Sequence, residues 1–215
     1  MRTRVFLVRH GATTLSSEDR FAGSTDVPLG VDGRDQAERL ADRLASAPLA
    51  AVYSSPMRRS VETAEIVARP HRLGLTVVDG LREIDHGRWE GCRRADVQQE
   101  YPIEYATWER DPVTFAPLGG ESGAQVLDRA LPAMNAIVRA HAGRSVLVVS
   151  HKATNRLLIA SLIGLDVHSY RERLEQLPAC LNLLEFNDPG GVRLVLLNDV
   201  SHYSPTEVAS GPPAV

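Results

Sequence analysis

The feature of this sequence that most constrains its fold is an alternation of short apolar runs with segments of helical period. Within 33–46, for example, Ala37, Leu40, Ala41 and Leu44 fall on one face and charged residues cover the other. The same reasoning predicts helices over 57–68, 123–140 and 152–163, with Ser122 as a cap candidate. The pattern indicates an α/β protein. The apolar runs of strand length are 5–8, 51–53, 76–78, 146–149, 181–186 and 192–197.

The length of 215 residues fits one domain, which we expect to span 1–204. The interval 91–120 contains Pro102, Pro112 and Pro117 without a clean period, so we expect short helices and loops there. Such an insertion between core elements is a natural lid-like segment over a site. Residues 205–215, rich in Pro, Ala and Gly, are expected to form a mobile tail.

Composition and charge exclude several classes of protein. No apolar stretch reaches the roughly 18 residues of a membrane span, and the run at 5–8 is too short for the core of a signal peptide. Only Cys92 and Cys180 occur, without the paired spacing of a zinc site, which favours a reducing compartment. The net charge of −3 argues against nucleic-acid binding. We therefore expect a cytoplasmic protein without nucleic-acid or membrane partners.

Polar residues stand where three of the predicted strands end. Ligands bind beyond the carboxyl ends of strands in open α/β sheets, so these three segments are expected to converge on one site. Two histidines and at least one arginine would then share a pocket. The segments are Arg9-His10-Gly11, Ser54-Ser55-Pro56 and Ser150-His151-Lys152.

These segments belong to an ordered set of motifs that resembles the histidine phosphatase superfamily, also called the phosphoglycerate mutase-like proteins. The resemblance covers nearly the whole chain. It implies a three-layer α/β/α sandwich with a mostly parallel central sheet and helices on both faces. The matching motifs are 7–13 around Arg9-His10-Gly11, the segment from Gly23 to Ala37, 55–64 with Arg59, 81–91 with Glu83, and 149–151 with His151.

The resemblance also implies roles for individual residues. His10 would be the nucleophile, Glu83 the proton donor and His151 the second active-site histidine, while Arg9 and Arg59 would bind phosphate. The chemistry fits these residue types, because a neutral imidazole is nucleophilic and arginine binds phosphate oxygens in a bidentate manner. A protonated His151 would donate to a phosphate oxygen, and a carboxylic acid can protonate a poor alkoxide leaving group. This scheme requires no metal and no other cofactor.

Several assignments leave alternatives open. Thr13 either binds phosphate or completes the turn after Gly11. Ser16 is a further phosphate-binding candidate, although many family members have asparagine there. Arg58 is the alternative to Arg59 as the phosphate-binding arginine. Lys152 stands where many relatives have glycine and is expected to be exposed, with contact to an anionic substrate as the alternative.

Glu83 could instead be a structural partner of Arg82 or Arg88, and the remaining histidines are expected to be surface or structural residues. Trp89 and Trp108 are expected to pack in the core or in the lid-like segment. These interpretations leave His10, Glu83 and His151 as the catalytic candidates.

The sequence therefore predicts a phosphatase that hydrolyses a small-molecule phosphate monoester through a phosphohistidine intermediate. The alternative is a cofactor-dependent phosphoglycerate mutase, because the superfamily contains both. Mutases known to us carry a longer insertion after the acid motif, which favours the phosphatase. A third hypothesis is a non-catalytic module that binds phosphorylated ligands. The sequence does not identify which phosphate ester is the substrate. A homodimer is one possible oligomeric state.

Overall fold

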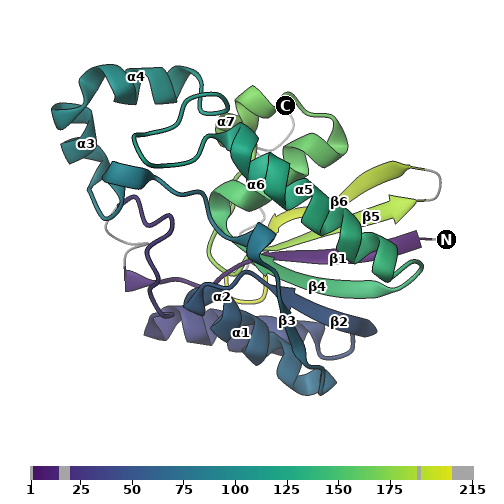
Figure 1. Cartoon of the computed structure of the whole chain (residues 1–215). Helices are drawn as coiled ribbons and strands as arrows, with labels where there is room; N and C mark the ends of the chain where they lie inside the picture. Colours follow the sequence, from purple (N-terminus) through teal and green to yellow (C-terminus); the bar gives the residue numbers. More distant parts are fainter. Residues whose placement is uncertain (1, 15–19, 188–189, 205–215) are drawn as a thin grey trace, which may run out of the picture.

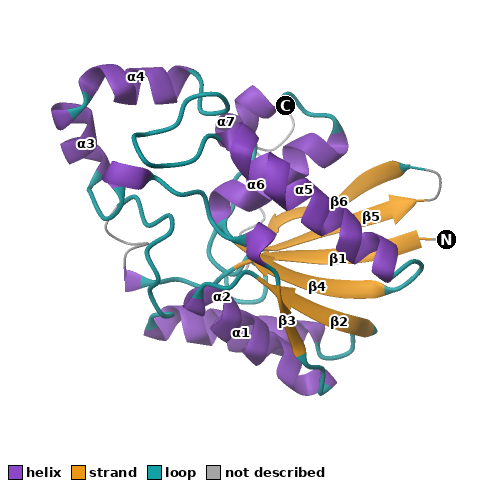
Figure 2. Cartoon of the chain, viewed as in Figure 1, coloured by secondary structure: helices purple, strands orange, loops and turns teal. Residues whose placement is uncertain are grey.

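A twisted six-stranded sheet runs through the middle of the computed structural model, which describes residues 2–14, 20–187 and 190–204 (Figures 1 and 2). The strand order is β3-β2-β4-β1-β5-β6. The first four of these strands pair in parallel, whereas β5 and β6 are antiparallel. All six predicted strands form, and the sheet is mostly parallel. The strands are β1 (Arg2–Arg9), β2 (Leu49–Ser54), β3 (Leu75–Val77), β4 (Ser145–Ser150), β5 (Leu181–Asn187) and β6 (Gly191–Asp199).

Helices cover both faces of this sheet, as the resemblance implied. On one face, α1 (Val31–Leu44) and α2 (Arg58–Ala68) pack through Leu40 and Val67 against Val52 and Leu147. On the other, α5 (Gly123–Ala140) and α6 (Lys152–Ile163) complete the main apolar cluster (Figure 2). Each fully buried aliphatic side chain in these clusters contributes roughly 1.5–3 kcal/mol relative to exposure. The structure is a three-layer α/β/α sandwich.

The two central strands bring their carboxyl ends to the same level. In the pairing of β1 with β4, Val8 lies opposite Val149 and Arg9 opposite Ser150. Every residue of β4 is buried, because the strand has neighbours on both sides and helices on both faces. The residues that follow these strands therefore begin inside the protein.

The predicted helix boundaries agree closely with the structure. Gly123–Ala140 and Lys152–Ile163 are helical over their predicted ranges, and Gly164, with a φ of 72°, ends α6 in the left-handed conformation. The Ser122 side chain accepts a hydrogen bond from Gln125 N, and the Gln125 side chain accepts one from Ser122 N. This reciprocal pair confirms Ser122 as the cap of α5.

The interval 91–120 contains two short helices, α3 (Arg94–Glu100) and α4 (Pro102–Arg110), joined by loops. Figure 1 shows both helices standing apart from the sheet. They have an apolar cluster of their own, which includes Phe21, Trp89 and Trp108. The short helices and loops were predicted, whereas the lid-like role and the single-domain boundary stay predictions. A further short α-helix, α7, spans Tyr170–Arg173.

Two predictions lie outside the described residues: phosphate contact by Ser16, and the mobile tail at 205–215. Among the residues that the structure describes, no helix combines the length and apolarity needed to cross a membrane.

Candidate active site

His10, the candidate nucleophile, directly follows β1 and is buried, with 5% of its surface exposed. Its backbone N–H donates to Ser150 O at 3.0 Å, which ties it to the end of β4. The ring Nδ1 lies 2.7 Å from Gly11 O, a carbonyl that can only accept, so Nδ1 carries the hydrogen. The other ring nitrogen, Nε2, is left with its lone pair. Burial lowers the pKa of His10 well below 6.5, and Arg59 and Arg9 lower it further.

The glycine after His10 is required by a close approach of two backbones. A β-carbon on Gly11 would collide with the carbonyl of Gly33 at the start of α1. Gly11 N donates to Thr63 Oγ1 at 3.1 Å, and the Thr63 hydroxyl donates to Arg59 O at 2.7 Å. Thr63 therefore links the turn that presents His10 to the helix that presents Arg59.

Arg59, near the start of α2, reaches the nucleophile candidate. Its Nε lies 3.2 Å from His10 Nε2 and donates to it, while Nη1 and Nη2 donate to Thr25 O and Gly23 O at 2.7 and 2.8 Å. Arg59 is 2% exposed, whereas Arg58 is exposed and does not line the cavity. The structure thus favours Arg59 over Arg58 as the arginine of the site.

The segment that carries Gly23 and Thr25 is held in place by Glu90. The Glu90 carboxylate accepts hydrogen bonds from Ser24 N, Thr25 N and the Thr25 hydroxyl at 2.9, 3.2 and 2.8 Å. A side chain at position 23 would collide with the same carboxylate. Glu90 therefore positions the carbonyl groups that orient Arg59, a role that the sequence did not reveal.

His151 follows β4 and is completely buried. Its ring centroid lies 5.1 Å from that of His10, and its Nε2 lies 2.7 Å from Ser55 Oγ and 3.3 Å from Ser60 Oγ. The hydrogen bond between Ser55 Oγ and His151 Nε2 can run in either direction, according to the tautomer of the imidazole ring. The other ring nitrogen, Nδ1, is a buried atom without a partner among the described residues.

The charge state of His151 differs from the protonated form considered above. Burial lowers the pKa of His151 well below 6.5, and the positive charge of Arg59 lowers it further. His151 is therefore neutral at neutral pH. A neutral imidazole still donates one N–H, so hydrogen bonding to a phosphate oxygen does not require the imidazolium.

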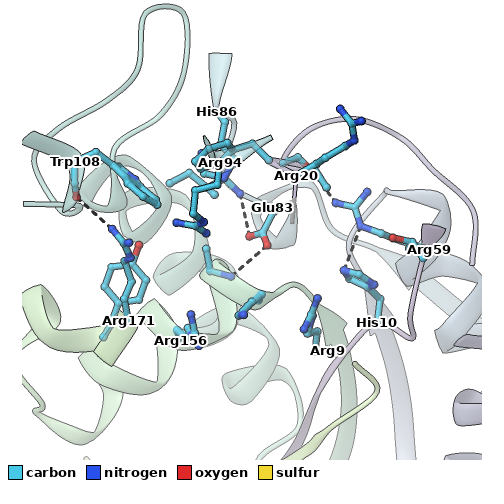
Figure 3. A pocket seen from close by; sticks show the side chains of 18 residues that line it. Arg9, His10, Arg20, Arg59, Glu83, His86, Arg94, Trp108, Arg156 and Arg171 are labelled. Atoms are coloured by element: carbon cyan, nitrogen blue, oxygen red, sulfur yellow. Dashed lines mark hydrogen bonds between the residues drawn. The ribbon is translucent and has the colours of Figure 1, made fainter. Parts of the chain in front are cut away.

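Glu83 lines the cavity at the amino end of α6. Its carboxylate accepts hydrogen bonds from Ala153 N at 3.2 Å and from the N–H and hydroxyl of Thr154, both at 3.1 Å. The structural alternatives do not hold, because Arg82 pairs with Asp79 and Glu121 and Arg88 pairs with Glu104. Glu83 is thus oriented by the helix terminus, with its carboxylate facing the cavity (Figure 3).

A cavity of about 210 Å³ connects these groups. Figure 3 shows His10 and Arg59 at one end, Trp108 and Arg171 at the other, and Glu83 and Arg156 between them. His151 is in ring contact with His10 and is not one of the residues that line the cavity. The described residues that line it are Arg9, His10, Thr13, Arg20, Phe21, Ala22, Gly23, Arg59, Glu83, Ile84, His86, Arg94, Trp108, Lys152, Ala153, Arg156, Tyr170 and Arg171.

Arg9 and Thr13 lie where the sequence placed them. Arg9 Nη1 donates to Gln176 O at 2.7 Å, and its Nε is buried without a partner among the described residues. Burial lowers the pKa of Arg9. Thr13 is buried and lines the cavity. Lys152, expected to be exposed, is half-buried in the cavity wall with its Nζ 3.6 Å from Glu175 Oε1.

The far end of the cavity was largely missed by sequence reasoning. Arg171 on α7 donates from Nη1 to Trp108 O at 3.2 Å, and its guanidinium lies 3.6 Å from the centre of the Trp108 ring. His86, expected to be structural, lines the cavity with its ring 4.7 Å from that of Phe21. Arg94 and Arg156 line it as well. His86, Arg94 and Arg171 lie on short helices and loops without a strand-end signal, and Arg156 lies on the predicted helix α6. The sequence therefore did not predict that these residues converge.

Among the described residues, no group of three or more His, Cys, Asp or Glu side chains is arranged to hold a metal ion. The cationic groups that face the cavity are arginine and lysine side chains. The site thus combines a buried neutral imidazole, arginines and a carboxylate.

Comparison with known proteins identifies the family of this chain. The model of the histidine phosphatase superfamily (branch 1) matches residues 5–200. The chain is 32% identical to Phosphoserine phosphatase 1 of Hydrogenobacter thermophilus, over 78% of this chain and 79% of that protein. It is 31% identical to the Probable phosphoglycerate mutase GpmB of Salmonella paratyphi A, over 93% and 94%. It spans 55% of the length of three longer mycobacterial relatives.

A solved structure gives the same answer for the fold. Bacillus stearothermophilus YhfR superimposes with a TM-score of 0.88 and 34% identity, covering 93% of this chain and 98% of that one. The predicted family and fold are confirmed, and the chain belongs to the histidine phosphatase superfamily, branch 1.

Proposed function

We propose that this chain is a phosphatase that hydrolyses a small-molecule phosphate monoester through a phosphohistidine on His10. The observation that carries the proposal is the state of the His10 ring. Its Nδ1–H is committed to Gly11 O, its Nε2 holds a lone pair beside Arg59, and its pKa is held well below 6.5 by burial first and by two arginines second. This imidazole is neutral and oriented at neutral pH, as nucleophilic attack requires.

In the first step, the phosphate group would lie between Arg59 and Arg9. Arg59 Nε then turns from His10 Nε2 to a phosphate oxygen, which frees the lone pair for in-line attack on phosphorus. Arg9 contributes its buried Nε–H. His151, whose ring centroid lies 5.1 Å from that of His10, would donate one ring N–H once the phosphate is bound. These fixed donors stabilise the charge that spreads over the phosphate oxygens in the transition state.

The leaving oxygen needs a proton, which Glu83 would supply from across the cavity. In the second step, the Glu83 carboxylate takes a proton from water, the water oxygen attacks phosphorus, and the bond from phosphorus to His10 Nε2 breaks. Free phosphate leaves and the neutral imidazole is restored. Glu83 thus acts first as an acid and then as a base, so each turnover returns it to the protonated state.

The phosphatase is favoured over a mutase by the segment that follows Gly91. This segment contains only the short helices α3 and α4 among its described helices. A mutase must keep water away from its phosphohistidine, and the mutases to which we compare the sequence carry a longer insertion at this place. One relative is named as a probable phosphoglycerate mutase, so the mutase is kept as the second candidate. The presence of His10, Arg59 and Glu83 around one cavity disfavours a module that only binds. Metal independence, a cytoplasmic location and a homodimer stay predictions.

The test is a turnover assay in the presence of a metal chelator over a panel of phosphate esters that includes 3-phosphoglycerate. Both free phosphate and 2-phosphoglycerate are measured. We expect release of phosphate from at least one ester and no isomerised product. Isomerisation without phosphate release would establish the mutase instead, and activity that appears only after a divalent cation is added would overturn the metal-free scheme.

A further inference from the structure

The cavity carries basic side chains in addition to those that bind the reacting phosphate. Lys152 and Arg156 lie one turn apart on α6, and Arg171 lies on α7. All three line the cavity. In Figure 3, Arg156 and Arg171 lie on the side of Glu83 that is remote from His10. The chemistry proposed above assigns none of them a role.

These cations are not balanced by the carboxylates that they contact. Lys152 Nζ and Arg156 Nη2 share one oxygen, Glu175 Oε1, at 3.6 and 3.1 Å. Arg171 Nη2 pairs with Glu109 at 2.7 Å. The same carboxylate lies 3.9 Å from Arg94 Nη1, so these two carboxylates contact four positive side chains of the cavity wall. The carboxylate of Glu83 also lies in the cavity, and the proposed mechanism requires it to be protonated when the ester binds. An anion in the cavity would restore the balance.

Burial makes the imbalance costly. The Arg156 side chain is 12% exposed, and its Nε is buried without a hydrogen-bond partner among the described residues. A buried donor without a partner loses its hydration and gains nothing in return. Burial lowers the pKa of Lys152, and the charges of Arg156 and Arg9 lower it further. Each of these groups would be stabilised by a bound anion.

We propose that Lys152, Arg156 and Arg171 form a second anion subsite, so that the substrate is a phosphate monoester with a second anionic group, a carboxylate or another phosphate. This inference rests on the proposed phosphatase function. The reacting phosphate lies between Arg9 and Arg59, and the second anion lies in the same cavity beyond Glu83. The Trp108 ring beneath Arg171 holds that guanidinium at the cavity wall.

The test uses three esters of one chain length: n-propyl phosphate, 3-(phosphonooxy)propanoate and propane-1,3-diyl bisphosphate. In the unmodified protein, we expect kcat/KM for at least one of the two anionic-tailed esters to exceed that for n-propyl phosphate about tenfold or more. The better of the two identifies the carboxylate or the phosphate as the preferred group. Equal kcat/KM values for all three esters would overturn the subsite.

Variants separate this subsite from a general effect of charge. Arg156→Gln is expected to reduce the ratio between the anionic-tailed ester and n-propyl phosphate to near unity, and Lys152→Gln to reduce it in part. Glu175→Gln, which removes the shared carboxylate, is expected to raise the ratio. The exposed Arg193→Gln on β6 is the matched control and should leave the ratio unchanged. An unchanged ratio in Arg156→Gln and Lys152→Gln would contradict the assignment.

Equilibrium binding distinguishes the failure of the subsite from the failure of the proposed function. Calorimetry with the His10→Ala protein compares the same three esters without turnover. Preferential binding of the anionic-tailed esters, with no hydrolysis by the unmodified protein, would remove the phosphatase and retain the subsite. Hydrolysis of all three esters without preferential binding would retain the phosphatase and remove the subsite.

Discussion

The two ends of the cavity are built from different parts of the fold. At the nucleophile end, His10 and His151 follow the two central strands and are buried in the protein interior. At the far end, Trp108 and Arg171 come from the short helices α4 and α7. The nucleophile end is tied by strand pairing and backbone hydrogen bonds, and the far end by side-chain ion pairs and ring contacts.

This difference indicates a division of labour: the nucleophile end carries out the reaction, and the far end selects the substrate. Groups that attack or stabilise phosphorus must be held closely, because small displacements cost large factors in rate. Groups that choose among substrates can vary with the loops and short helices that carry them. Changes at the nucleophile end should therefore lower kcat, and changes at the far end should alter KM and the choice of ester.

The largest effect is expected at Glu83, which faces the cavity between the two ends. Glu83→Gln removes the proton donor, so kcat for alkyl phosphates should fall about 10²- to 10⁴-fold. p-Nitrophenol is a good leaving group, so loss of the acid should slow the phosphorylation step far less with p-nitrophenyl phosphate. Stopped-flow measurement of nitrophenol release gives that step directly. Glu38→Gln, on an exposed face of α1, is the control. Equal losses in the phosphorylation step for both kinds of ester would remove Glu83 as the acid.

A smaller effect is expected on stability at mildly acidic pH. The folded-state pKa values of His10 and His151 lie well below 6.5, so between those values and 6.5 the unfolded chain binds more protons. Stability should therefore fall as the pH drops below about 6.5, by up to roughly 1.4 kcal/mol per pH unit for each histidine. Urea denaturation at pH 7.5 and 5.5 measures the change.

Matched variants assign that pH dependence. His151→Gln should make the loss of stability between pH 7.5 and 5.5 smaller, whereas replacement of the exposed His168 by Gln should not. If the loss were the same in both variants, the buried position of His151 would not be its source.

The smallest effect is expected at Trp108. Trp108→Phe keeps an aromatic ring but weakens the contact with Arg171 by about 0.5–1 kcal/mol, so KM should rise about two- to fivefold with kcat unchanged. Trp89→Phe is the control, because Trp89 belongs to the same aromatic cluster but does not line the cavity. Steady-state kinetics on both variants give the comparison. A fall in kcat at Trp108 as large as that at Glu83 would contradict the division of labour.

The two ends also differ in how far the sequence predicts them. The positions of His10 and His151 were predictable, because the strand ends that they follow are recognisable from apolar runs. Arg59 was predicted from the resemblance of its segment to a family motif. The convergence of Arg156 and Arg171 was not, since it depends on how α6 and α7 pack and on irregular segments with no period. The causes that lower the pKa of His151, its burial and the neighbouring arginines, likewise become visible only in the folded chain.

The central claim is that phosphate passes through Nε2 of His10. The most direct measurement is the product of mixing the Glu83→Gln protein with p-nitrophenyl phosphate, because phosphorylation then needs no acid while hydrolysis of the intermediate is slowed. Mass spectrometry and ³¹P NMR should show a phosphoryl group on His10 Nε2, absent from a protein that also carries His10→Ala. Phosphorylation of Nδ1 or of another residue would contradict the account. Release of nitrophenol by the Glu83→Gln protein without any phosphoryl group on that protein would also contradict it.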